Sequence, residues 1–193
     1  MSDAVGTRVA GRRGFTDHAL FGMAIFVFTE VMLFAAFTSA FLIIRNSTPP
    51  GMWPPADQPR LPFESTAFNT ALLLVSGILV VWAQRAFARG PAGARLPLTL
   101  ALLLGVAFVG LQGFEWAGLL AQGLTMTSSQ IGGFFYLIVG CHALHALCAL
   151  TLLAVCWRGL MNGTLRASRL AAAQLFWSFV VLVWPIVWLV VYR

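Results

Sequence analysis

The sequence predicts an all-α, polytopic membrane protein: a bundle of five transmembrane helices with the N-terminus in the cytoplasm and the C-terminus outside. Composition is the first reason. Of 193 residues, 60% are apolar and only 9% are charged, and the mean hydropathy is +0.87. Soluble domains carry about 25% charged residues. This composition excludes a disordered chain, a disulfide scaffold and an ordinary cytosolic enzyme.

The second reason is the length of the apolar runs. A helix needs about 20 mostly apolar residues to cross the hydrocarbon core of a bilayer. Five runs meet this requirement, and the backbone must satisfy its own hydrogen bonds in lipid, so each run is expected to be a helix. The runs cover residues 19–44, 67–88, 96–121, 131–157 and 171–192.

The third reason is the placement of the basic residues. All 12 are arginines, and they lie between the apolar runs, which indicates membrane-flanking charge rather than binding to nucleic acid. Nine of them fall in the N-terminal segment and in the second and fourth connections, against three elsewhere. The positive-inside rule then places the N-terminus in the cytoplasm and the first connection outside.

The domain organisation follows from the runs. Residues 1–18 are expected to form a basic cytoplasmic arm, and residues 19–193 a single five-helix transmembrane domain. The longest connection, residues 45–66, is rich in proline. The first run is too long for the apolar part of a signal peptide and contains Glu30, so no cleavable leader is expected.

Ionisable side chains inside the runs are the candidate functional residues, because each costs at least ~2.5 kcal/mol at the centre of a membrane helix. Glu30 lies in the middle of the first run. His142 and His145 lie in the middle of the fourth, three residues apart and therefore on one face. The matching depths predict a contact between Glu30 and one of these histidines. Gln112 and Glu115, in the outward third of the third run, are further polar candidates.

Three interpretations of this cluster remain open. Buried polar groups most often pair with one another, which favours a polar clasp between helices. A role in supporting proton entry is the second interpretation. A metal site is the third, since Cys141 lies four residues before His145. A haem would need a second histidine at matching depth, and His18 lies near the inner surface. We therefore expect no haem and no metal in this chain.

The last run carries three tryptophans, Trp177, Trp184 and Trp188. Aromatic side chains in a membrane helix commonly face lipid or a partner subunit, and we expect this orientation for all three. Trp116, near the end of the third run, suits the outer membrane interface.

Several sequence blocks, in order along residues 15–193, resemble subunit III of the haem–copper oxidases in its short five-helix form. The related small proteins linked to nitric oxide reductase share the likeness. The blocks are Phe28-Thr29-Glu30-Val31-Met32-Leu33-Phe34, Trp53-Pro54-Pro55, Leu61-Pro62, Asn69-Thr70-Ala71-Leu72-Leu73-Leu74, Gln112-Gly113-Phe114-Glu115-Trp116, His142-Ala143-Leu144-His145 and the pair Trp177 and Trp184.

The resemblance implies an accessory, non-catalytic subunit of a respiratory oxidase that couples electron transport to proton translocation. It implies that the chain packs on the catalytic haem–copper subunit I and on subunit II, in the inner membrane of a bacterium. Haem and copper would belong to those partner subunits, and this chain would bind phospholipid and support proton uptake and complex stability. Two helices that precede the Glu30 helix in the longer family form are expected to be missing.

The last run departs from the family pattern. Where the family often has a histidine and an aspartate, this chain has Ser178 and Val181. Polar contacts made through those two side chains are therefore absent, which indicates a divergent branch. The alternative functions are an accessory subunit of a nitric oxide reductase, an independent small transporter, and a membrane enzyme or metal-binding protein that uses Glu30, Cys141 and the two histidines.

Overall fold

The computed structural model describes residues 7–47, 63–123, 125–127 and 130–192. Five long helices make up nearly all of this part of the chain, and it contains no strand. They are α1 (Thr7–Ser47), α2 (Phe63–Arg89), α3 (Pro91–Ala121), α4 (Gln130–Met161) and α5 (Ala167–Tyr192). Each is long and apolar enough to cross a membrane, so the predicted all-α membrane bundle is confirmed.

The helices begin and end close to the predicted bounds, with one marked difference at the N-terminus. Helix α1 begins at Thr7, so residues 7–18 of the expected basic arm continue the first helix. This stretch contains no proline, and nothing requires a helix to stop where it leaves the hydrocarbon. Helix α3 starts on Pro91, which suits the first helical position because that backbone nitrogen would lack a partner anyway.

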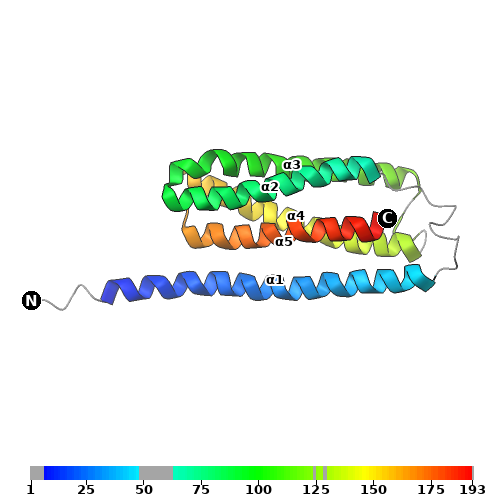
Figure 1. The fold of residues 1–193 in the computed structure, drawn as a ribbon, viewed down its shortest axis with the longest axis horizontal. Helices are drawn as coiled ribbons and strands as arrows, with labels where there is room; N and C mark the ends of the chain where they lie inside the picture. Colours follow the sequence, from blue (N-terminus) through cyan, green and yellow to red (C-terminus); the bar gives the residue numbers. More distant parts are fainter. Residues whose placement is uncertain (1–6, 48–62, 124, 128–129, 193) are drawn as a thin grey trace, which may run out of the picture.

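The five helices run alternately up and down (Figure 1). The start of α1, the α2–α3 turn and the α4–α5 turn therefore lie at the same end of the bundle. The turn between α4 and α5 uses Gly163 at φ +69°, a left-handed conformation that glycine adopts at little cost. The fold thus brings the arginine-rich segments of the second and fourth connections to the same end of the bundle.

Several features of the sequence prediction lie outside the described residues: the blocks Trp53-Pro54-Pro55 and Leu61-Pro62, and the arginine at position 60.

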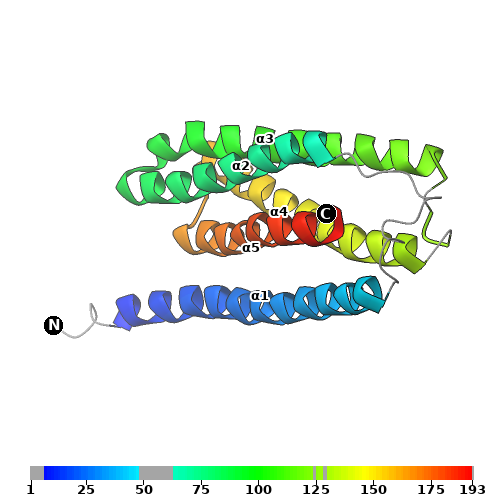
Figure 2. The same cartoon turned by 45° about the vertical axis from the view of Figure 1, so that its right-hand side comes forward.

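Helix α5 is the centre of the arrangement. It contacts α1, α2 and α4, and α2 packs along nearly its whole length on α3 (Figures 1 and 2). Helix α1 lies on one side of the bundle, beside α5, and touches α4 only locally. Its outward side chains include Phe21, Phe28 and Ile43, each 65% exposed. In a membrane these side chains contact lipid or another subunit.

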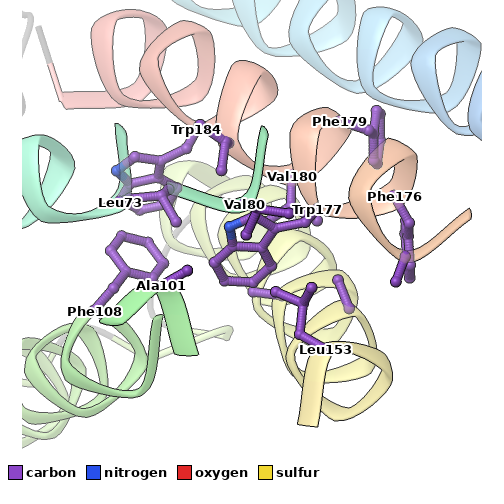
Figure 3. Close-up of a cluster of buried hydrophobic side chains, with 14 of the residues drawn as sticks. Leu73, Val80, Ala101, Phe108, Leu153, Phe176, Trp177, Phe179, Val180 and Trp184 are labelled. Carbon is purple, nitrogen blue, oxygen red and sulfur yellow. The ribbon is translucent and has the colours of Figure 1, made fainter. Parts of the chain in front are cut away.

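The core lies where α5 faces α2, α3 and α4 (Figure 3). Trp177 and Trp184 are fully buried there, so the expectation that they face lipid or a partner subunit is wrong. The reason is a close approach at Gly105 on α3, where an added Cβ would lie 3.0 Å from the ring of Trp177. Similarly, a Cβ on Gly77 would lie 2.9 Å from Val181. The two glycines on α2 and α3 let the large side chains of α5 enter the bundle.

Candidate functional site

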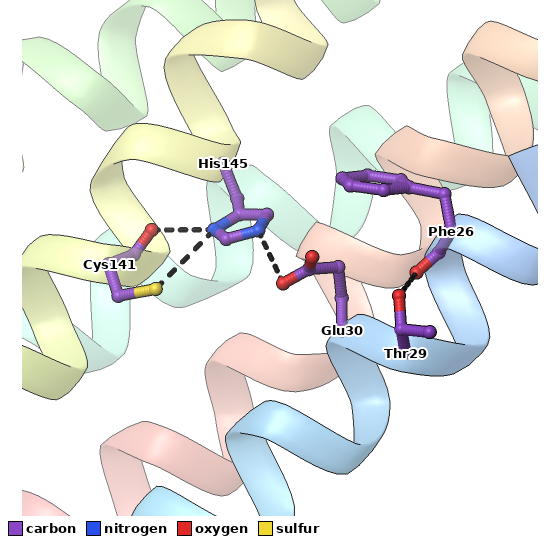
Figure 4. Close-up of polar contacts among 5 residues, drawn as sticks. All are labelled: Phe26, Thr29, Glu30, Cys141 and His145. Atoms are coloured by element: carbon purple, nitrogen blue, oxygen red, sulfur yellow. Dashed lines mark hydrogen bonds and ion pairs between the residues drawn. The ribbon is translucent and has the colours of Figure 1, made fainter.

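Glu30 of α1 and His145 of α4 meet inside the bundle. The Oε2 atom of Glu30 lies 2.9 Å from Nε2 of His145 (Figure 4). Their side chains are only 16% and 11% exposed. The contact predicted between Glu30 and one of the two histidines is therefore present, and His145 is the partner. It is the polar link between the outlying helix α1 and helix α4.

The backbone fixes the tautomer of His145. Its Nδ1 lies 2.7 Å from the carbonyl oxygen of Cys141, one turn earlier on α4 (Figure 4). A carbonyl oxygen can only accept, so Nδ1 carries a hydrogen and donates it. The Cys141 thiol, 3.7 Å from the same nitrogen, is a weaker second neighbour. Both ring nitrogens of His145 are thus engaged within the protein.

One proton is then shared between Glu30 and Nε2 of His145. Either a protonated Glu30 donates to a neutral imidazole, or a protonated imidazole donates to an ionised Glu30. The pair has zero net charge in both arrangements, which keeps an uncompensated charge out of the membrane interior. The pair can hold a proton at mid-membrane, and it can join two helices whichever partner holds that proton.

Aromatic rings surround this pair. The ring centroids of Phe34, Phe176 and Phe179 lie 5.5, 6.1 and 6.0 Å from that of His145. Phe26 adds a stacked contact at 6.4 Å. Apolar rings lower the local dielectric, which strengthens the Glu30–His145 hydrogen bond and makes the loss of either partner costly.

His142 does not take part in the contact with Glu30. Its side chain is 1% exposed, and its Nε2 lies 3.0 Å from the carbonyl oxygen of Val180 on α5. Because a carbonyl only accepts, this nitrogen is a donor. The ring also packs against Trp184, with centroids 4.8 Å apart. His142 therefore ties α4 to α5, while its neighbour one turn away ties α4 to α1.

Gln112 and Glu115 belong to a second polar group, at the interface of α2 and α3. Glu115 Oε2 accepts hydrogen bonds from the hydroxyl of Thr66, at 3.0 Å, and from the amide of Gln112, at 3.2 Å. The amide nitrogen of Asn69 donates to Gln112 Oε1 and to the carbonyl oxygen of Phe108, both at 3.2 Å. The two candidates from α3 are thus held by two residues of α2.

Sequence analysis missed the role of the polar residues on α2. Thr66, Asn69, Thr70 and Ser76 are all buried. Spacings of three (66–69), four (66–70) and seven (69–76) place them on one helix face, a pattern that could have identified an internal polar stripe. Asn69 and Thr70 were noted only as part of a family block.

Two of these hydroxyls accept from the buried tryptophans. Trp177 Nε1 donates to Ser76 at 3.2 Å, and Trp184 Nε1 donates to Thr70 at 2.9 Å. Ser76 in turn donates to the carbonyl oxygen of Ala101, at 2.8 Å, on α3. These bonds satisfy the two indole donors and tie α5 directly to α2 and, through Ser76, to α3.

The described part of the chain contains no group of three or more His, Cys, Asp or Glu side chains arranged to hold a metal ion. His18 is exposed on α1. The expectation that this chain carries neither haem nor metal stays a prediction.

Comparison with known proteins identifies the family. The family model described as cytochrome c oxidase subunit III matches residues 8–193. This chain belongs to the cytochrome c oxidase subunit III family. Curated proteins named cytochrome c oxidase subunit 3 are similar to it. Those of Oncorhynchus mykiss and Gadus morhua are 34% and 33% identical over 180 residues, and that of Lumbricus terrestris is 34% identical over 179 residues. In each case the match covers 89% of this chain and 68% of the relative.

Family membership and the five apolar helices together establish the general role. The subunit III chain is a multi-pass membrane protein of the respiratory chain, and a subunit of a haem–copper oxidase complex that contains other subunits. The Glu30–His145 pair and the Glu115 group are therefore intramembrane features of an oxidase subunit.

Proposed function

We propose that this chain is an accessory, non-catalytic subunit that supports proton uptake and durability of the oxidase during turnover. In this proposal it packs on the catalytic haem–copper subunit I and on subunit II, in the inner membrane of a bacterium, and binds phospholipid. Haem and copper belong to the partner subunits. The observation that carries the proposal is the Glu30–His145 pair, which keeps one proton at mid-membrane with no net charge.

The hydrogen bonds of the two histidines support a non-catalytic role. Both ring nitrogens of His145 already have partners, and Nε2 of His142 donates to Val180. To ligate a metal or haem, His145 would have to give up one of these two bonds inside an apolar environment. The pair is suited to fixing α1 against the bundle, and it is the intramembrane acid–base pair through which this subunit would affect proton uptake.

The test uses the intact oxidase complex carrying Glu30→Gln. The Gln amide can still donate to Nε2 of His145, but the shared proton is gone. We expect an initial oxidase activity close to that of the wild type, followed by faster loss of activity during turnover. The matched control is Glu64→Gln, an exposed carboxylate in the first turn of α2.

Two outcomes would contradict this role. Immediate loss of activity with assembly intact would make direct proton transfer through Glu30 the better account. Identical time courses for Glu30→Gln, Glu64→Gln and the wild type would remove any role of the pair in turnover. Copurification after mild detergent extraction tests the partners: the chain should elute with a haem-bearing subunit, and metal analysis of the isolated chain should find neither iron nor copper.

The orientation of the bundle is part of the proposal. The positive-inside rule places the arginine-rich end in the cytoplasm. In a chain whose three cysteines are replaced by alanine, an impermeant thiol reagent added from outside should label Met52→Cys and not Arg89→Cys. The reverse pattern would overturn the orientation.

A further inference from the structure

A narrow cavity lies between α3 and α4, separate from the Glu30–His145 contact. Its volume is about 190 Å³. Buried side chains of Phe108, His142 and Trp184 form its floor. Its rim includes Gly113 and Leu147, which are exposed on the surface of the bundle that faces the membrane. The cavity therefore opens sideways toward lipid.

The shape of the cavity limits what it can hold. Its lining residues run from 108 to 116 on α3 and from 139 to 147 on α4. At 1.5 Å per residue the lining extends about 12 Å parallel to the helices, and a volume of about 190 Å³ over that length describes a narrow channel. A helix, roughly 10 Å across, is too wide to enter. The walls are nearly all apolar, and such cavities stay free of water. One extended hydrocarbon chain fits both the width and the direction.

One residue that lines the cavity, Trp116, carries a buried polar atom without a partner in the described part of the chain. The indole nitrogen of Trp116 is buried and has no hydrogen-bond acceptor within the described part of the chain. Trp116 lines the cavity five residues before the end of α3, which is the end where lipid headgroups begin. Tryptophan at this depth commonly donates to polar groups of the membrane interface. The missing acceptor is of the kind that an ester carbonyl of a lipid supplies.

We propose that the cavity between α3 and α4 holds one acyl chain of a membrane phospholipid, and that the ester carbonyl of that chain accepts a hydrogen bond from Trp116 Nε1. This inference rests on the lipid-binding part of the proposed function and specifies its site. The chain enters between Gly113 and Leu147 and lies on Phe108, His142 and Trp184.

The experiment uses the intact oxidase complex in phosphatidylcholine vesicles. A small fraction of the lipid carries a photoactivatable diazirine at the middle of one acyl chain, and the labelled positions are mapped by mass spectrometry after illumination. We expect labelling of Val109, Ala143 and Leu147 to exceed by at least threefold the labelling of exposed apolar residues on α1.

Gly113→Leu should reduce this labelling at least fivefold, because its side chain fills the cavity. A Cβ at position 113 meets no atom within 4 Å, so the bundle can accept the substitution. The matched control is Gly110→Leu on the same helix. A Cβ there also meets nothing within 4 Å, but residue 110 does not line the cavity. Labelling of the cavity residues in this variant should therefore equal that in the wild type. Trp116→Phe removes only the N–H group and should lower the labelling two- to threefold.

Uniform labelling of all membrane-facing helices would overturn the proposal, and so would equal labelling of Gly113→Leu and Gly110→Leu. If Gly113→Leu fails to assemble, unchanged labelling in Trp116→Phe would overturn the assignment of the ester carbonyl. Labelling is measured at rest, without turnover. Failure here therefore leaves the Glu30→Gln time course unaffected, and failure of that time course leaves the labelling pattern unaffected.

Discussion

Helices α5 and α1 are both apolar enough to cross a membrane, yet 44% of the most apolar window of α5 is buried inside the bundle and only 6% of that of α1. Around α5, Trp177 and Trp184 fit against α2 and α3 and donate to Ser76 and Thr70. Helix α1 is held by aromatic contacts with α5, by the Glu30–His145 pair, and at its far end by Arg45. The guanidinium of Arg45 lies 3.5 Å from the carbonyl oxygen of Val190.

This difference shows what holds helices together in lipid. Burying apolar surface against another helix gains little in a membrane, because lipid tails are as apolar as the side chains they replace. Close packing and satisfied hydrogen bonds must supply the stability instead. Helix α5 has both over its whole length. Helix α1 buries fewer side chains, chiefly Phe34 and Phe41, and adds one buried polar pair, so its attachment should be sensitive to single substitutions at that pair.

The largest effect is expected in the core around α5. Trp177→Ala should lower the free energy of unfolding by roughly 3–5 kcal/mol, because it opens a cavity beside Gly105 that the bundle cannot close. The loss of stability is measured by thermal denaturation of the purified complex, monitored through the fraction of this subunit that stays soluble. The control is Trp82→Ala, since Trp82 is 52% exposed on α2. Equal losses in the two variants would contradict the assignment of Trp177 to the core.

An intermediate effect is expected at the attachment of α1. Glu30→Ala or His145→Ala leaves the other partner buried without its hydrogen bond, at about 1–3 kcal/mol each. The double variant should cost little more than one single variant, because both remove the same contact. Unfolding titrations in mixed micelles give the three free energies. Strict additivity would show that the two side chains are not coupled.

The smallest effect is expected at Arg45. Its contact with the last turn of α5 places a cation near the negative end of that helix, an arrangement worth about 0.3–1 kcal/mol and weakened by salt. Arg45→Ala should therefore lower the unfolding free energy slightly at low salt and less at high salt. Arg95→Ala, at an exposed position near the start of α3, is the control. A loss larger than that of Glu30→Ala would reverse the order of the two α1 contacts.

Most of the fold could be predicted from the sequence, because the membrane imposes rules that act locally. Five runs of sufficient length had to be helices, since lipid offers the backbone no other hydrogen-bond partner. The contact between Glu30 and a histidine was predictable in the same way, from depth alone. Depth could not choose between His142 and His145, because residues three apart lie near the same level. The rotation of α4 about its own axis decides which histidine meets Glu30, because it points His145 toward α1 and His142 toward Val180 on α5.

The positions of the tryptophans show the opposite case. Their spacing along the last run is compatible with facing lipid, a partner subunit or the bundle. The direction in which the tryptophans face is set by the space beside Gly77 on α2 and Gly105 on α3. The hydroxyls of Thr70 and Ser76 on α2 add the acceptors for the indole N–H groups. These residues lie between 72 and 114 positions in the sequence from the residues they contact, which are Trp177, Val181 and Trp184. No local sequence pattern therefore connects them.

The sequence by itself determined that the chain is a membrane bundle of five helices with ionisable groups at mid-membrane. Length, hydropathy and the cost of buried charge are properties of each segment on its own. Only the tertiary structure decided that α5 is central and α1 peripheral, that both nitrogens of His145 are engaged, and that α3 and α4 leave a cavity between Gly113 and Leu147. The physical reason is that all five helices are nearly equally apolar, so their neighbours are selected by side-chain shape and hydrogen-bond pairing, which appear only when the helices meet.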